Sequence, residues 1–291
     1  MSSAERGTSV CDEIEAQKRS NRSSVALGDA FAGHRERLTG LVLRAAPGDG
    51  ARLCVLGAGN CLDLELEALS ARYREIHLVD LDDEALRAAY ARQPDAVRAK
   101  LSLHAPVDIS GLFERLERWA GGSVTPDDLM SLPVAVPSEL ARRLPVPFDV
   151  VLSSCLLTQI QLTLYRVLTE RHPLFEPLRE LVGLSHLRAL ASLVAKGGRA
   201  ILATDVASTV DGSLDLASLG DPREALRKTL DEGRAIDVAD PRHIAWLATV
   251  DPMLARIIRV SEAGETWFWH NGPDRVFLVY AIDLFRSEDS T

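Results

Sequence analysis

Cysteine is scarce in this chain, and its placement excludes the sites that cysteine most often builds. The four residues are Cys11, Cys54, Cys61 and Cys155, and no two of them form a Cys-x-x-Cys pair. Zinc sites and the disulfide frameworks of small secreted proteins need paired or regularly spaced cysteines. The sequence therefore predicts no metal site and is typical of a protein kept in a reducing cytosol.

Long apolar runs are also missing. The opening stretch, MSSAERGTSVCDEIEAQKRSNRSS, is polar and has no apolar signal core. No later run approaches the roughly twenty apolar residues that span a bilayer. We expect a cytoplasmic location and no membrane partner.

Positive charge is in deficit. The chain has 33 Lys and Arg against 42 Asp and Glu, which gives a formal net charge of −9. A surface of this sign repels a phosphate backbone unless a local basic patch overcomes the repulsion. The small cluster of His34, Arg35 and Arg37 is interrupted by Glu36 and lies in a helical pattern, so we interpret it as a solvated helix face. We expect no nucleic acid partner.

The chain does contain an alternation of short apolar runs with longer helical patterns over its 291 residues. Such alternation is typical of βαβ units. The expected fold class is α/β, with a Rossmann-like, doubly wound, mainly parallel seven-stranded sheet, an antiparallel C-terminal hairpin and helical cap insertions. The expected strands are 52–56, 76–79, 101–105, 148–152 and 199–203, followed by hairpin strands 265–270 and 275–284. The expected helices are 62–71, 83–92, 156–168 and 178–194.

We expect a single domain over residues 22–291, after a flexible N-terminus over 1–21. Three segments are additional to the strands and helices of the core. They are a leading helix (about 25–44), an insertion (about 121–147) and a helical cap segment (about 205–264). The insertion is rich in Gly, Pro, Ser and Asp, which is typical of an excursion from the core. In an open α/β sheet, segments after the strands project over the ligand crevice, so these segments are the expected place of substrate selection.

A glycine turn is the strongest local motif. Gly57, Ala58, Gly59 and Asn60 follow a strand and open a helix, and Asp80 ends the next strand about twenty residues later. Glycines let a backbone pass close to a ligand, and a carboxylate at this distance can accept both hydroxyls of a ribose. The motif therefore predicts nucleoside binding. A dinucleotide site prefers a third small residue where this chain has Leu62, so a pyrophosphate cofactor is disfavoured.

From about Leu53 to Leu284 the chain resembles the class I S-adenosylmethionine-dependent methyltransferases. The matching motifs are Val55 to Cys61, Asp80-Leu81, Val107-Asp108-Ile109, Phe148 to Cys155, Gly197-Gly198-Arg199 and the terminal hairpin. The resemblance implies S-adenosylmethionine as cofactor, with S-adenosylhomocysteine as its product. It also implies a glycine turn under the methionine part, Asp80 on the ribose, Leu81 beside the adenine, and Asp108 with Ile109 at the adenine amino group. Ser153 and Ser154 would then lie near the reacting methyl.

The chain departs from that family at two positions. Val55 stands where the family often has an acidic residue, and Cys61 stands where it often has a third glycine. Asp63 or backbone carbonyls could serve the methionine ammonium instead, but Asp63 also fits a first helical turn, where a negative charge is favourable.

Other site candidates have structural alternatives. Asp108 could cap a helix that begins near Gly111, and the hydroxyls of Ser153 and Ser154 could satisfy loop backbone groups. Cys155 is interpreted as a small buried hydrophobe. Trp267 and Trp269 share one face of a strand, which is expected to pack on the sheet, and Gly197 with Gly198 is expected to cap the preceding helix.

The function expected from these motifs is methyl transfer to a small-molecule acceptor, at oxygen or nitrogen, with specialised metabolism as one setting. The first alternative is a non-catalytic methyltransferase-like binding protein, and the second is an NAD(P)-dependent oxidoreductase. No metal is required, because a sulfonium methyl is already activated. A hydroxyl or protonated amine as acceptor needs a base. His270 and Gln159 are the weak catalytic candidates, and His34, His104, His186 and His243 are not ranked against them.

Overall fold

The structure is a computed structural model that describes residues 8–120, 125–216, 219–261, 264–272 and 274–288. One sheet organises the described chain, with strands in the order β3-β2-β1-β4-β5-β8-β6, and β7 also pairs with β8. The first five strands are β1 (Ala51–Leu56), β2 (Tyr73–Val79), β3 (Leu101–His104), β4 (Phe148–Ser154) and β5 (Val194–Ser208). The last three are β6 (Ile258–Val260), β7 (Glu265–His270) and β8 (Val276–Arg286).

Strands β1 to β5 are mutually parallel, whereas β8 runs antiparallel to β5, β6 and β7. The expected α/β class, mainly parallel sheet and antiparallel C-terminal hairpin are confirmed. The described sheet has eight strands and not seven, because two short strands, β6 and β7, share one edge of the long strand β8.

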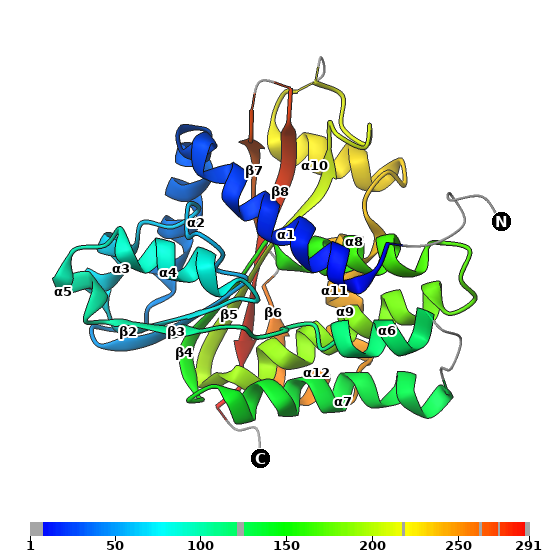
Figure 1. The fold of residues 1–291 in the computed structure, drawn as a ribbon, viewed down its shortest axis with the longest axis horizontal. Helices are drawn as coiled ribbons and strands as arrows, with labels where there is room; N and C mark the ends of the chain where they lie inside the picture. Colours follow the sequence, from blue (N-terminus) through cyan, green and yellow to red (C-terminus); the bar gives the residue numbers. More distant parts are fainter. Residues whose placement is uncertain (1–7, 121–124, 217–218, 262–263, 273, 289–291) are drawn as a thin grey trace.

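Helices cover both faces of the sheet (Figure 1). One face carries α2 (Ala32–Ala45), α3 (Leu66–Arg72), α4 (Asp83–Ala91) and α5 (Asp95–Arg98). The other carries α6 (Phe113–Ala120), α7 (Pro126–Arg143), α8 (Leu156–Leu168), α9 (Phe175–Leu193), α11 (Pro241–Val250) and α12 (Leu254–Ile257). Alternate residues of β1 supply the two cores: Leu53 and Val55 face one, and Cys54 and Leu56 the other. Central strands buried on both faces explain the short, wholly apolar runs in the sequence.

The expectation of a flexible N-terminus over residues 1–21 is wrong for its second half. Residues Val10–Ser24 form helix α1. The expected leading helix at about 25–44 is divided into two elements, the 3₁₀ segment η2 (Val25–Phe31) and α2. Ser9 caps α1 by accepting a hydrogen bond from the N–H of Asp12 at 3.1 Å. Val10 and Glu13 are buried, so tertiary contacts stabilise a helix whose polar composition concealed it. Residues 1–7 lie outside the described residues.

The expected insertion at 121–147 is mostly helix. Thr125 and Asp128 cap α7 reciprocally, and Pro126 occupies its first turn, where a missing N–H is harmless. Pro133 and Pro137 lie inside the helix, and both are buried. Contrary to the expectation from the sequence, the proline content of this stretch therefore does not mark an excursion from the core. Leu129, Leu132, Val136 and Leu140 give α7 an apolar stripe at helical spacing that joins the core. Residues 121–124 lie outside the described residues.

The expected cap at 205–264 begins and ends in the sheet, because β5 continues to Ser208 and β6 is a strand. Between them lie α10 (Pro222–Asp231), the 3₁₀ turn η4 (Asp237–Ala239), α11 and α12. Asp221 and Asp240 cap α10 and α11, and a proline starts each helix, as the two Asp-Pro pairs in the sequence predict. Residues 217–218 and 262–263 lie outside the described residues.

Gly197 and Gly198 do not cap α9, which ends at Leu193. They lie in the first part of β5, where Gly197 has a φ of +75° and a Cβ on Gly198 would lie 2.7 Å from the carbonyl oxygen of Asp149. Gly198 therefore permits close approach to β4, whereas Gly197 permits a left-handed backbone conformation. No helix of the described residues combines the length and apolarity needed to cross a membrane.

Candidate functional site

A cavity of about 650 Å³ opens at the carboxyl ends of β1, β2 and β4 and extends along the end of β5. Six of the ten predicted cofactor residues line it: Gly57, Gly59, Asp80, Leu81, Asp108 and Ile109. The other four, Ala58, Asn60, Ser153 and Ser154, do not. The edge of the sheet at which parallel strands end is where open α/β sheets bind ligands, so this cavity is the candidate site.

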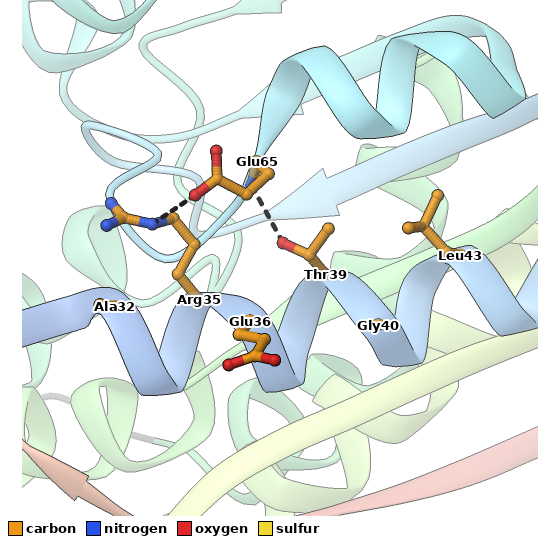
Figure 2. Close-up of a pocket in the computed structure, with 7 residues that line it drawn as sticks. All are labelled: Ala32, Arg35, Glu36, Thr39, Gly40, Leu43 and Glu65. Carbon is orange, nitrogen blue, oxygen red and sulfur yellow. Dashed lines mark hydrogen bonds and ion pairs between the residues drawn. The ribbon is translucent and has the colours of Figure 1, made fainter.

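A smaller hollow of about 410 Å³ lies between α2 and the turn before α3. Figure 2 shows Arg35 and Glu65 pointing toward one another across it, with Arg35 Nε 2.7 Å from Glu65 Oε1. Thr39 Oγ1 accepts a hydrogen bond from the backbone N–H of Glu65 at 3.0 Å. None of the predicted site residues lines this hollow, and three of its polar residues, Arg35, Thr39 and Glu65, are bonded to one another. This hollow is therefore interpreted as a packing contact between α2 and the turn before α3, and not as a ligand site.

Asp80 holds the glycine turn in place. Its two oxygens accept hydrogen bonds from the N–H groups of Gly59 and Asp82, each at 2.8 Å. Burial raises the pKa of Asp80, and the backbone N–H groups lower it in part. A carboxylate offers about four lone-pair positions, so two bonds leave capacity for a ligand's hydroxyls on the cavity side.

The turn itself requires glycine at two positions. Gly57 has a φ of +73° and Gly59 a φ of +47°, a region that side chains rarely adopt. A Cβ on Gly57 would lie 3.2 Å from the Cβ of Leu156, and one on Gly59 would lie 3.1 Å from Asn21 Oδ1. Two elements therefore close on this turn: the start of α8 and the N-terminal helix α1.

Asp108 caps the helix that follows it, as the structural alternative predicts. Its Oδ1 accepts hydrogen bonds from the N–H groups of Ser110 and Gly111, each at 3.0 Å, and Oδ2 accepts one from the N–H of Phe113 at 2.9 Å. Burial raises the pKa of Asp108, and the hydrogen bond from the Ser110 hydroxyl opposes the increase. Asp108 and Ile109 remain on the cavity wall, so an adenine contact at this loop is still a prediction.

Asn60 faces α1 and not the cavity. Its Nδ2 donates to the backbone oxygen of Asn21 at 2.6 Å and to the hydroxyl of Ser24 at 2.9 Å. Ala58 is buried among the apolar residues beneath the turn. These two members of the glycine motif therefore support the turn from outside the cavity.

The two serines that end β4 contact other partners. Ser153 Oγ lies 2.8 Å from His186 Nε2 in the interior, and the Ser154 hydroxyl donates to Asp63. Successive side chains of a strand point to opposite faces, so the two serines are directed away from each other and neither meets the cavity. The geometry therefore gives no support to the expected cofactor contact of Ser153 and Ser154.

Asp63 precedes α3, which begins at Leu66, so its expected place in a first helical turn is wrong. Burial raises its pKa to about 6, and the hydrogen bond from Ser154 opposes the increase. The residue does not line the cavity, so a contact with a ligand ammonium has no support in the geometry.

Of the two catalytic candidates, Gln159 lines the cavity and His270 does not. His270 is exposed at the end of β7. His34 is buried against Trp267 and Trp269, and burial lowers its pKa to about 3. His186 is buried beside Ser153, with a pKa lowered to about 4, and neither histidine reaches the cavity. His104 and His243 do not line it either.

Trp267 and Trp269 share one face, as predicted, and Trp267 packs into the core. Trp269 differs, because it lines the cavity while its ring stacks on His34 with the ring centroids 4.3 Å apart. Burial raises the pKa of the Cys155 thiol, which agrees with its interpretation as a buried hydrophobe.

Sequence reasoning missed two parts of the site. Helix α1 forms one wall with Glu13, Gln17, Lys18 and Asn21, and the Ser9-x-x-Asp12 cap was the signal for it. The second part is Asp205 on β5, which accepts a hydrogen bond from Thr158 of α8. Asp205 lies two residues beyond the expected strand, where a carboxylate resembles an ordinary loop residue.

The strand order decides the fold. A plain dinucleotide-binding sheet is mostly parallel, and an antiparallel strand in such a sheet lies at its edge. Here the parallel strands β3, β2, β1, β4 and β5 are followed by β8, which runs antiparallel between β5 and the β6–β7 edge. The chain has the class I methyltransferase fold.

No protein-family model and no curated protein matches the chain. Among solved structures, magnesium protoporphyrin IX methyltransferase (ChlM) from Synechocystis PCC 6803 with bound SAH is 10% identical, with 91% of this chain and 86% of that chain covered and a TM-score of 0.45. The glycopeptide N-methyltransferase MtfA, complexed with S-adenosyl-L-homocysteine, is 14% identical over 87% and 90%, with a TM-score of 0.43. TrmN from Thermus thermophilus is 16% identical over 86% and 48%, with a TM-score of 0.44. The assignment of the fold rests on the strand order of this chain and not on these similarities.

Proposed function

We propose that this chain transfers a methyl group from S-adenosylmethionine to the oxygen or nitrogen of a small-molecule acceptor. The observation that carries the proposal is the place of Asp80. It ends β2, supports the glycine turn after β1 and faces a cavity with unused lone pairs. A ribose with two free hydroxyls matches that carboxylate, and the sequence departs from the pattern of a pyrophosphate site.

In this proposal Asp80 holds the ribose, Leu81, Asp108 and Ile109 flank the adenine, and the turn at Gly57 and Gly59 lies under the methionine part. The cofactor supplies an activated methyl group bound to sulfur. The protein aligns the acceptor with that methyl and excludes water, which does not require a metal. Helices α1 and α8, which close on the glycine turn, provide the exclusion. A cytoplasmic location belongs to the same proposal and is supported by four free cysteines.

Transfer of labelled methyl tests this function. The protein is incubated with S-adenosylmethionine labelled in the methyl group and with the small-molecule fraction of cells that carry its gene. Label is expected to enter small molecules with the parent protein and to fall at least about tenfold with Asp80→Ala, the loss expected for about 1.4 kcal/mol. Binding of S-adenosylhomocysteine without any transfer would establish the non-catalytic binding protein instead.

A further inference from the structure

The part of the cavity at the end of β5 carries a carboxylate without a basic partner among the described residues. Asp205 lies on β5 and accepts a hydrogen bond from the hydroxyl of Thr158, at the start of α8. Within the described residues no lysine, arginine or histidine forms an ion pair with it. Burial raises the pKa of Asp205, the Thr158 hydrogen bond lowers it, and nearby Asp211 raises it further. A half-buried carboxylate of this kind is poorly compensated until a cation reaches it.

Strand spacing places Asp205 on the acceptor side of the site. The order β2-β1-β4-β5 puts Asp205 three strand positions from Asp80, or about 14 Å at about 4.8 Å per strand. It lies two strand positions, about 10 Å, from the glycine turn that ends β1. Asp205 is also two residues beyond Ala203, whose carbonyl accepts the N–H of Cys155 at the end of β4. If the ribose of the cofactor lies at Asp80 and its methionine part at the glycine turn, Asp205 lies beyond the cofactor, where the methyl acceptor would bind.

An aromatic pair lies near this carboxylate. Ser208, Phe277 and Trp269 are direct partners on the neighbouring strands β5, β8 and β7, and all three line the cavity. The rings of Trp269 and Phe277 are 5.2 Å apart. Asp205 pairs with Val279, two residues along β8 from Phe277, which corresponds to about 7 Å. A negative group and an aromatic surface are thus separated by the length of a short side chain.

We propose, on the basis of the proposed function, that the methyl acceptor is a small amine with an apolar or aromatic group, bound through its nitrogen at Asp205 and through its apolar part against Phe277 and Trp269. An acceptor that arrives as an ammonium ion transfers one proton to the Asp205 carboxylate. The free nitrogen lone pair then forms the N–C bond as the C–S bond breaks, and the C–S electron pair stays on sulfur. The product leaves as the methylated ammonium ion, and the proton on Asp205 passes to solvent.

The test uses the full chain saturated with S-adenosylhomocysteine and measures binding by calorimetry. The probes form matched sets: phenethylamine, 2-phenylethanol and 3-phenylpropionate, then tryptamine and indole-3-propionate. At least one amine is expected to bind at least about tenfold more tightly than its matched alcohol and carboxylate. Asp205→Asn keeps the shape and an acceptor for Thr158, and it should weaken amine binding at least about tenfold.

Affinity for S-adenosylhomocysteine is the internal control, and Asp205→Asn should leave it within about twofold. Asp95→Asn is the matched variant and should leave amine binding unchanged, because the Asp95 side chain is 91% exposed and does not line the cavity. Asp205→Ser replaces the first variant if its folding, checked by circular dichroism, is impaired.

Tighter binding of the alcohols or carboxylates, no amine binding, or amine binding that Asp205→Asn leaves unchanged would overturn the amine proposal. Failure to bind S-adenosylhomocysteine at the outset would overturn the proposed function itself, so the two failures are distinguishable.

Discussion

At the scale of single residues, Asp80 joins the two halves of the site. The carboxylate accepts N–H groups from the turn after β1 and from Asp82 after its own strand, and it still faces the cavity. Its place was predictable because the motif fixes both the strand end and the spacing. The hydrogen bonds of Ser153 and Ser154 were not, because their partners, His186 and Asp63, are distant in the chain and only the packed fold brings them together.

Asp80→Ala should weaken binding of S-adenosylhomocysteine by about ten- to hundredfold. The hydroxyls of the ribose lose a charged acceptor worth about 1.5 to 3 kcal/mol, and the glycine turn loses its support. Calorimetry on the variant measures this, with Asp95→Ala as a surface control because the Asp95 side chain is 91% exposed and paired with neighbouring Arg98. Binding within twofold of the parent would show that Asp80 does not hold the ligand.

Asp63 should give stability a measurable pH dependence. Its folded pKa of about 6 is above the ordinary 3.8, so the folded chain holds a proton that the unfolded chain has already lost. The contribution of this group to stability is therefore full below pH 3.8 and is lost as pH rises to about 6. Asp63→Asn, which does not titrate, should gain in melting temperature relative to the parent across this window. Parallel melting curves from pH 4 to 7 would contradict the assignment.

At the scale of elements, helix α1 is the largest difference between expectation and structure. Its sequence is polar, and periodicity alone could not predict it, because its stability comes from contacts with distant segments. Gln17 donates to the Thr163 hydroxyl at 2.9 Å, Glu13 pairs with Arg166 at 3.0 Å, and Asn21 donates to Asp82 at 3.0 Å. Figure 1 shows α1 lying across the molecule toward α8. A ligand in the cavity would thus be covered by α1.

S-adenosylhomocysteine should protect α1 from trypsin. Lys18, Arg19 and Arg22 are cleavage sites on this helix, and cleavage requires the helix to open. If opening requires release of the ligand, cleavage should slow by up to about a hundredfold at a ligand concentration about a hundred times its Kd. Mass spectrometry of timed digests resolves these sites from Arg142 and Arg143 on α7, where no protection is expected. Equal protection at both helices would indicate global stabilisation instead.

The segment at 205–264 is also an integral element and not a detachable lid. Ile244 and Leu254 are buried in the core, and Ile258 lies in the sheet. Its helix caps were predictable from local sequence, whereas the extension of β5 to Ser208 was not, because pairing with β8 determines it. Acceptor choice is therefore better tested by single substitutions such as Asp205→Asn than by deletion of the segment.

At the scale of the whole molecule, the fold was the most predictable property. Apolar runs of buried strands, the glycine turn and the hairpin each have a local signature, and together they fix the layers and the order of elements. Long-range packing determines that β6 and β7 share the last edge of the sheet and that residues 10–24 form a helix. Neither feature could therefore be predicted from the local sequence alone.

The net charge of −9 gives a prediction at the same scale. Transfer RNA and duplex DNA should not be retained with the protein on a filter at physiological salt, because the summed field opposes their phosphates. Tight retention that weakens steeply as salt rises would reveal a basic surface patch and would move the acceptor from small molecules to nucleic acid.

Calorimetry with four ligands tests the central claim most directly. The purified chain is titrated separately with S-adenosylmethionine, S-adenosylhomocysteine, NAD and NADP. S-adenosylmethionine and S-adenosylhomocysteine should each saturate one site, and neither dinucleotide should bind. The reason is that the site offers a carboxylate for a ribose at Asp80 but, at Leu62, lacks the third small residue of a pyrophosphate turn. Binding of NAD or NADP with no response to S-adenosylhomocysteine would contradict it and would assign the cavity to a dinucleotide.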